Sequence, residues 1–109
     1  MKTIKISGKN YDMKSSAYTQ FAYKNKTGRS LLNDLQLLND VDATKQVEDL
    51  VDILLNVSYV MIEEANKDQV KNYEEFVKGI DDLFSDSTWI SEVVQLAITP
   101  LSGGNIQKS

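Results

Sequence analysis

Residues 50–62, with the sequence LVDILLNVSYVMI, form the most densely apolar stretch of the chain and decide its fold. At about 13 residues the stretch is too short for a membrane span, which takes roughly 20 apolar residues. Its apolar side chains point around nearly the whole circumference of a helix, as they do in a helix that other helices surround. We therefore predict a central core helix that starts after Asp42 or Thr44 and ends near Asn66.

Weaker apolar patterns on both sides of this stretch predict four further helices. Leu31, Leu35 and Leu38 recur at i, i+4 and i+7, which is the spacing of one helix face. The predicted helices run from a cap at Ser15 or Ser16 to about Thr27, from Leu31 to about Asp40, from a cap at Asn72 to Phe84, and from a cap at Ser87 to Pro100. Gly28 suits the left-handed residue that ends a helix, and Pro100 is expected to end or kink the last one.

The amino terminus has the alternation of a β-hairpin at residues 3–14. Ile4 and Ile6 alternate with polar residues, as do Tyr11 and Met13, and the turn is expected at Gly8, Lys9 and Asn10. A lone hairpin is barely stable in water, so its apolar face is expected to pack on the helices.

Together these elements predict a mainly α protein, a small helical bundle of about five helices with an N-terminal β-hairpin. With 109 residues the chain has room for one ordinary domain, which we place at residues 1–101. Residues 102–109, with Gly103 and Gly104, have too little apolar surface to order themselves and are expected to form a flexible tail. There is no Cys, so apolar burial and not disulfides must hold the fold together.

The composition argues against catalysis. The chain has no His and no Cys, and therefore lacks the commonest general base, the commonest zinc ligands and any thiol nucleophile. No nucleophile elbow, phosphate-binding loop or calcium-binding loop is present either. We predict that the protein is not an enzyme, with no catalytic residues, no metal and no cofactor. The remaining catalytic hypothesis is a carboxylate, Asp52, set in the apolar stretch close to Asp49.

Charge is distributed unevenly along the chain. Residues 1–29 carry seven basic residues and one acid, a net charge of +6, while the remainder carries five basic residues and fifteen acids, a net charge of −10. The two portions are expected to attract each other or to select partners of opposite charge. A small nucleic-acid-binding or transcription-modulating protein that uses the basic N-terminal third is the alternative function, although an acidic remainder repels polyanions.

The order of short motifs in the N-terminal third resembles a known family. The opening Ile4-Lys-Ile-Ser-Gly-Lys-Asn-Tyr11, followed by Met13-Lys14, an aromatic helix and Thr27-Gly-Arg-Ser-Leu-Leu32, resembles the tail assembly chaperones of long-tailed phages and prophages of Gram-positive bacteria. The resemblance covers the whole chain in order and size. It implies a small helical protein of the bacterial host cytoplasm, absent from the mature virion, that binds the phage tape-measure protein and helps recruit tail-tube subunits.

The resemblance brings no transferable set of binding residues, so the contact residues are hypotheses from residue type alone. They are the basic Lys24, Lys26 and Arg29, together with Trp89 and Val93. Trp is enriched in binding hot spots, but the alternative for Trp89 is packing in the core. Repeated binding along a filament also suggests a homo-oligomer, which the sequence leaves open.

Overall fold

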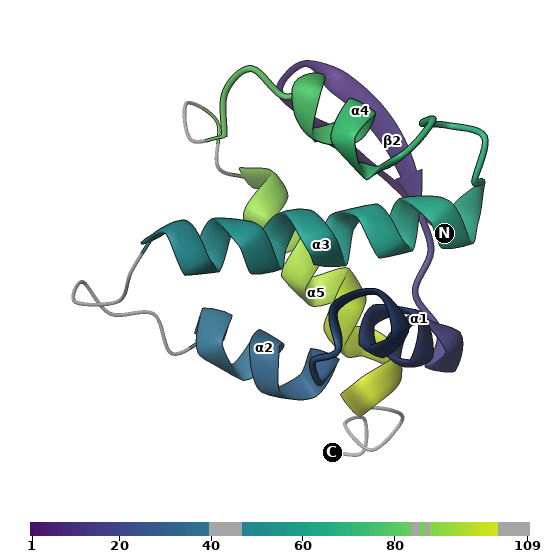
Figure 1. The fold of residues 1–109 in the computed structure, drawn as a ribbon, viewed down its shortest axis with the longest axis vertical. Coiled ribbons are helices and arrows are strands. Elements are labelled where there is room, and N and C mark those ends of the chain that lie inside the picture. The colour runs from purple at the N-terminus through teal and green to yellow at the C-terminus, as the bar shows by residue number, and fades with distance from the viewer. Residues whose placement is uncertain (40–46, 84–85, 87, 103–109) are drawn as a thin grey trace.

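A computed structural model of the chain describes residues 1–39, 47–83, 86 and 88–102. Over these residues the chain forms two strands and five helices (Figure 1): β1 (Lys2–Ile6), β2 (Lys9–Met13), α1 (Ala17–Thr27), α2 (Leu31–Asn39), α3 (Val47–Ala65), α4 (Tyr73–Lys78) and α5 (Thr88–Ser102). The predicted fold class, mainly α with an N-terminal hairpin, is confirmed.

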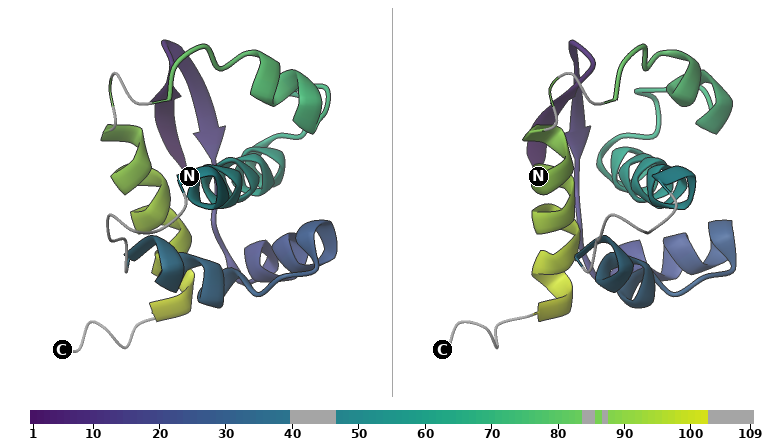
Figure 2. Two further views of the ribbon diagram at one scale, coloured as in Figure 1. Left: turned by 60° about the vertical axis from the view of Figure 1, so that its left-hand side comes forward. Right: turned by 90° about the vertical axis from the view of Figure 1, so that its left-hand side faces the viewer.

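Helix α3 is central, as its apolar sequence predicts. The hairpin and α4 lie on one side of it, α1 and α2 lie on the other, and α5 crosses it (Figures 1 and 2). Side chains around its circumference are buried, including Ile53, Leu54, Val57, Val60 and Ile62. A helix with neighbours on several sides gains stability from apolar burial on each of them, which explains why the polar residues that reach solvent in its middle are confined to a narrow edge at Asp52 and Asn56.

The hairpin is antiparallel, with Ile4 opposite Tyr11 and Lys2 opposite Met13. The side chains of Ile4, Ile6, Tyr11 and Met13 are buried against the helices, as predicted. The turn lies one residue earlier than expected, at Ser7 and Gly8, because this two-residue turn needs positive φ at both positions, and they have φ values of 54° and 85°. The outer edge of β2 is covered by the side chain of Gln69, which donates to Asp12 O and accepts from Asp12 N, both at 2.8 Å.

Two helix boundaries differ from the prediction. Helix α4 ends at Lys78, well before Phe84, because Gly79 terminates it and the N–H groups of Asp81 and Asp82 then donate to the Ser7 hydroxyl in the hairpin turn. Helix α5 continues two residues past Pro100, since losing one hydrogen bond in the final turn does not prevent helical geometry.

The other boundaries agree with the sequence patterns. Ser16 caps α1, Asn72 caps α4, and Gly28 ends α1 in the left-handed conformation with φ 75°. The expected cap at Ser87, the end predicted at Asp40 and the caps predicted at Asp42 or Thr44 lie outside the described residues. Ser102, the first residue assigned to the tail, belongs to α5, and the remainder of that tail also lies outside the described residues.

Candidate functional site

Helix α1 is attached to the core through polar contacts at its first turn. The hydroxyl groups of Ser16 and Thr19 both donate to the carboxylate of Glu64, near the end of α3. Thr19 is almost completely buried, and its Oγ1 also accepts from Ser16 N at 2.8 Å. Because a carboxylate bound by two hydroxyl groups holds both in fixed positions, these contacts fix the rotation of α1 about its own axis.

The inner face of α1 reaches α2 through a buried carboxylate. Asp34 accepts hydrogen bonds from the Tyr23 hydroxyl at 2.6 Å and from Arg29 Nε and Nη2 at 2.8 and 2.7 Å. The side chain of Asp34 is 2% exposed, whereas that of Arg29 is 55% exposed. The Arg29 guanidinium therefore covers the Asp34 carboxylate on its solvent side, and the Tyr23 hydroxyl contacts it from the core.

This arrangement changes the protonation of both buried groups. Burial alone would raise the pKa of Asp34, but the hydrogen bonds from Arg29 and Tyr23 and the charge of Arg29 outweigh burial and lower it. The pKa of Tyr23 is raised, first by burial and then by its hydrogen bond to Asp34. The ionised Asp34 carboxylate therefore joins α1 to α2, and the Tyr23 hydroxyl stays protonated and donates to it.

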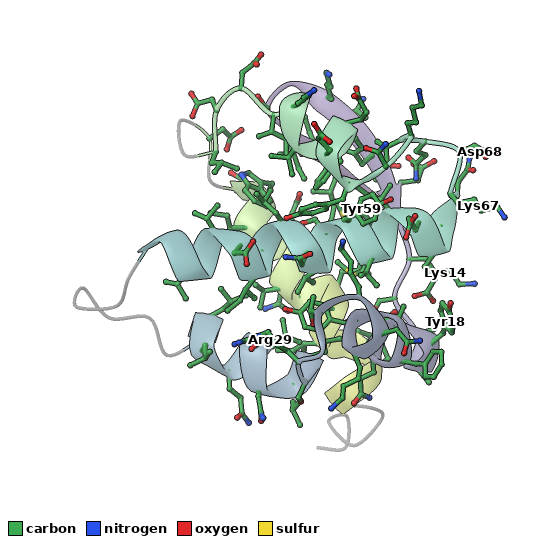
Figure 3. The ribbon with its side chains drawn as sticks, in the orientation of Figure 1. Lys14, Tyr18, Arg29, Tyr59, Lys67 and Asp68 are labelled. Carbon is green, nitrogen blue, oxygen red and sulfur yellow. The ribbon has the colours of Figure 1, made fainter. Side chains whose placement is uncertain are left out.

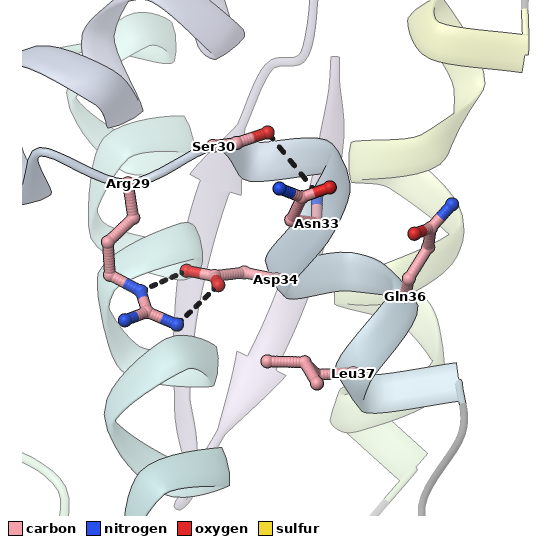
Figure 4. A pocket seen from close by; sticks show the side chains of 6 residues that line it. All are labelled: Arg29, Ser30, Asn33, Asp34, Gln36 and Leu37. Carbon is pink, nitrogen blue, oxygen red and sulfur yellow. Dashed lines mark hydrogen bonds and ion pairs between the residues drawn. The ribbon is translucent and has the colours of Figure 1, made fainter.

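A shallow pocket of about 540 Å³ lies beside this ion pair and is lined by Arg29, Ser30, Asn33, Asp34, Gln36 and Leu37 (Figure 4). The two charges in its wall face each other, and both oxygens of Asp34 already accept hydrogen bonds. The pocket consequently offers no free carboxylate for a cation, and we assign it no ligand.

Lys26 projects from α1 toward α3 and α4. Its Nζ lies 4.1 Å from the ring centroid of Tyr73 and 5.0 Å from that of Tyr59, which are cation–π distances. The Tyr59 hydroxyl donates to Glu63 at 2.8 Å, and burial together with that bond raises the pKa of Tyr59 to about 12. Lys26 therefore serves the fold and is not wholly available to a partner.

The outer face of α1 carries two exposed aromatic rings. Tyr18 is 58% exposed and Phe21 is 60% exposed, and their ring centroids lie 5.8 Å apart. Helical spacing alone would direct such a pair into the core, but the polar contacts of the inner face turn it outward. We call these two residues, with the exposed Lys14 and Lys24 at either end of them, the aromatic surface of α1. In Figure 3, Lys14 and Tyr18 point outward along the same edge of the molecule.

The basic residues of the N-terminal third do not form one patch. The hairpin and α1 lie on opposite sides of α3 (Figures 1 and 2). On the hairpin side, Lys2 lies 4.0 Å from Glu92, while Lys5 shares a small pocket with Asp82 and Asp86. Two of the hairpin lysines thus lie near acids of the same chain, an arrangement compatible with attraction between the basic and the acidic portions. Within the described part of the chain, Lys14 and Lys24 form no such ion pair.

The five candidate contact residues separate into two groups. Lys24, Lys26 and Arg29 lie at the surface on or just after α1. Trp89 and Val93 are buried in the core from α5, and the Trp89 Nε1–H donates to Leu83 O at 2.9 Å. The core alternative for Trp89 is the one that the structure supports, and neither side chain presents a surface in this conformation.

The catalytic hypothesis for Asp52 gains nothing from the fold. Its side chain is exposed and lies 3.4 Å from Asn56 Nδ2, on a face with no enclosed pocket among those described. The part of the chain that the structure describes contains no group of three or more acidic side chains placed to hold a metal ion. In the same residues, no helix combines the length and apolar character that crossing a bilayer requires.

Two features of the site were missed by sequence reasoning. The first is the set of hydrogen bonds that Asp34 accepts from Tyr23 and Arg29, and the sequence does contain a sign of it. Asp34 lies one turn after Leu31 on the apolar stripe of α2, and a carboxylate on an apolar stripe indicates a buried ion pair. The outward orientation of Tyr18 and Phe21 has no such sign, since it depends on the bonds of Ser16 and Thr19 to Glu64, which lies 48 and 45 residues away from them.

Comparison of the chain with protein-family models, with curated proteins and with solved structures finds no significant match. The class that fold and site define is therefore a small helical protein with a packed hairpin and an exposed aromatic surface on one helix.

Proposed function

We propose that this protein is a non-enzymatic chaperone of bacteriophage tail assembly. It binds the tape-measure protein in the host cytoplasm, helps recruit tail-tube subunits and is absent from the finished virion. The observation that carries the proposal is the aromatic surface of α1, where two rings are exposed beside a well-packed core. This helix belongs to the segment on which the resemblance to the tail assembly chaperones rests.

The size of the aromatic surface suits a temporary contact. Complete burial of an aromatic side chain removes about 150–250 Å² from water, and Tyr18 and Phe21, which are 58% and 60% exposed, can bury only part of that on association. Two rings and their neighbours therefore provide much less than the roughly 1,200 Å² of a stable interface. A chaperone that covers a filament segment until tube subunits replace it must release that segment. Modest affinity at each contact, repeated along a long partner, meets this requirement.

The test is co-expression of the untagged chain with the tape-measure protein encoded by the same genome, followed by capture of the tape-measure protein at high salt. We expect the chain to co-purify, and we expect the tape-measure protein to be soluble only when the chain is present. Phe21→Ser should abolish co-purification. Leu32→Ala, which truncates an exposed apolar residue on α2, is the matched control and should preserve it.

Failure of a folded chain to bind would count against the chaperone proposal and favour the nucleic-acid alternative. That alternative is the weaker one, because the basic residues divide between two sides of α3 (Figure 2) and two of them, Lys2 and Lys5, lie near acids of the same chain. Salt separates the two functions. Binding to a polyanion weakens steeply as salt is added, whereas capture through aromatic rings beside two lysines weakens only slightly.

A further inference from the structure

We infer that the aromatic surface of α1 binds an acidic amphipathic helix, a partner segment in which carboxylates flank a short apolar stripe. The inference rests on the proposed function and sharpens it by naming the chemistry of the segment that the chaperone holds. Three observations support it: the spacing of the rings, the sign of the charges around them and the rigidity of the helix that presents them.

The spacing fits a helical partner. Tyr18 and Phe21 are three residues apart and their ring centroids are separated by 5.8 Å, close to the 5.4 Å pitch of an α-helix. Apolar side chains at i and i+3 or i+4 of a partner helix repeat at the same interval. One helical turn of the partner can therefore place its two apolar residues against the two rings.

The charge around the rings selects acidic partners. Lys14 lies in the connection between β2 and α1 and points outward along the same edge as Tyr18 (Figure 3), while Lys24 lies three residues after Phe21 on α1. The rings therefore have a cation on either side. Helix α1 contains no acidic residue, and Glu64, the nearby carboxylate, is already bound by Ser16 and Thr19. Because the whole chain has a net charge of −4, an acidic partner is repelled elsewhere and is directed to this face.

The helix that presents the rings is held in place. Thr19 and Tyr23 on its inner face are buried and bonded to Glu64 and Asp34, and Lys26 is seated over Tyr73. A rigid surface loses little conformational entropy on binding, which helps a small contact to have measurable affinity. The helix that carries the rings therefore needs no rearrangement before a partner binds.

The experiment is an NMR titration of the full chain with three probes. The first is a helical peptide in which Leu residues at i and i+3 or i+4 are flanked by Glu, the second has Lys in place of every Glu, and the third is a DNA duplex. We expect the Glu peptide to bind and to shift the signals of residues 14–28, with an affinity at least about tenfold higher than that of the Lys peptide.

Matched variants separate the apolar and the charged contributions. Phe21→Ser should weaken binding of the Glu peptide roughly tenfold, and Leu32→Ala should not. Lys24→Glu should weaken it several-fold and reduce its salt dependence, whereas Lys71→Glu should change little. Lys71 is also exposed, but it lies in the connection between α3 and α4, which runs on the opposite side of α3 from α1 (Figure 1).

The outcomes are distinct. Equal binding of the Lys peptide, or loss of binding in the Leu32 variant as large as in the Phe21 variant, overturns the inference. DNA binding at this face that disappears in Lys24→Glu and survives Phe21→Ser also overturns it, in favour of a phosphate backbone. If the peptide fails while the tape-measure protein still co-purifies, only this inference fails. If the peptide binds while co-purification fails, the proposed chaperone function fails and the surface stands.

Discussion

The two faces of helix α1 invert the usual arrangement of polar and apolar residues. Thr19 on the inner face is buried, and it bonds to a carboxylate of α3. Tyr18 and Phe21 on the outer face are more than half exposed, although they are among the largest apolar side chains in the helix. A polar anchor and an exposed aromatic pair thus lie within about one turn of the same helix, on opposite faces.

The difference shows what each face is for. Burying polar groups is unfavourable unless they are bonded, and the inner face satisfies them through Glu64 and Asp34. Those bonds are directional, so they fix the rotation of the helix where apolar packing alone would let the aromatic rings turn inward. The hydrogen bonds of the inner face therefore keep the aromatic rings of the outer face exposed.

The largest effect is expected from the apolar core on which the inner face rests. Leu54 of α3 is buried, and Leu54→Ala should lower the free energy of unfolding by about 2–5 kcal/mol because it leaves a cavity. Thermal and urea denaturation measure this loss. An unchanged melting temperature would contradict the central position of α3.

Asp34→Ala should be the next most damaging change. It removes a buried carboxylate that accepts three charge-assisted hydrogen bonds and leaves the Tyr23 hydroxyl without its acceptor. We expect a loss of about 2–3 kcal/mol in urea denaturation. Asp68→Ala, at an exposed position, is the control and should stay within about 0.5 kcal/mol of the wild type. Equal effects of the two changes would mean that Asp34 does not join α1 to α2.

Two tyrosines five residues apart test the comparison most directly. Tyr23→Phe removes the buried donor to Asp34 and should cost about 1–2 kcal/mol of stability. Tyr18→Phe removes an exposed hydroxyl from the outer face and should cost almost nothing. Matched urea titrations of the two variants measure the difference. If Tyr18→Phe lowers the free energy of unfolding more than Tyr23→Phe does, the hydroxyl of Tyr18 and not that of Tyr23 stabilises the fold, and the two faces of α1 are wrongly assigned.

Lowering the pH should remove the stability that the Asp34 carboxylate contributes. The pKa of Asp34 is lowered in the folded chain from its ordinary value of 3.8, so the carboxylate stabilises the fold above that value. The contribution is lost as the pH falls through the folded pKa. The difference in unfolding free energy between the wild type and Asp34→Asn should hold near neutral pH and shrink below about pH 4. A difference that stays constant down to about pH 2 would show that the charge of Asp34 contributes no stability.

Local patterns predicted most of the fold because they act over a few residues. The apolar stretch at residues 50–62 specifies a surrounded helix, and the alternation around Gly8 specifies a hairpin. The end of α4 was misjudged because the N–H groups of Asp81 and Asp82 bond to Ser7, which is more than 70 residues away. No local pattern contains that contact.

The candidate site was predictable only in part, for the same reason. The basic residues Lys24, Lys26 and Arg29 were chosen as candidates by their charge, and Lys26 and Arg29 have partners within the fold. Trp89 was considered because of its residue type, but its depth in the core follows from the packing of α5 against the hairpin and α3. Exposure depends on tertiary contacts, and residue type alone does not determine it.

The smallest change in stability is expected on the outer face, where the functional effect is expected to be large. Phe21→Ser replaces a ring that is 60% exposed, and Phe and Ser have similar helix propensities. The free energy of unfolding should therefore stay within about 0.5 kcal/mol of the wild type in urea denaturation. A loss above about 1 kcal/mol would mean that the ring already packs within the folded chain, so that Tyr18 and Phe21 stabilise α1. If Phe21→Ser leaves the free energy of unfolding unchanged and abolishes binding, the ring at this position contributes to binding a partner and not to the fold.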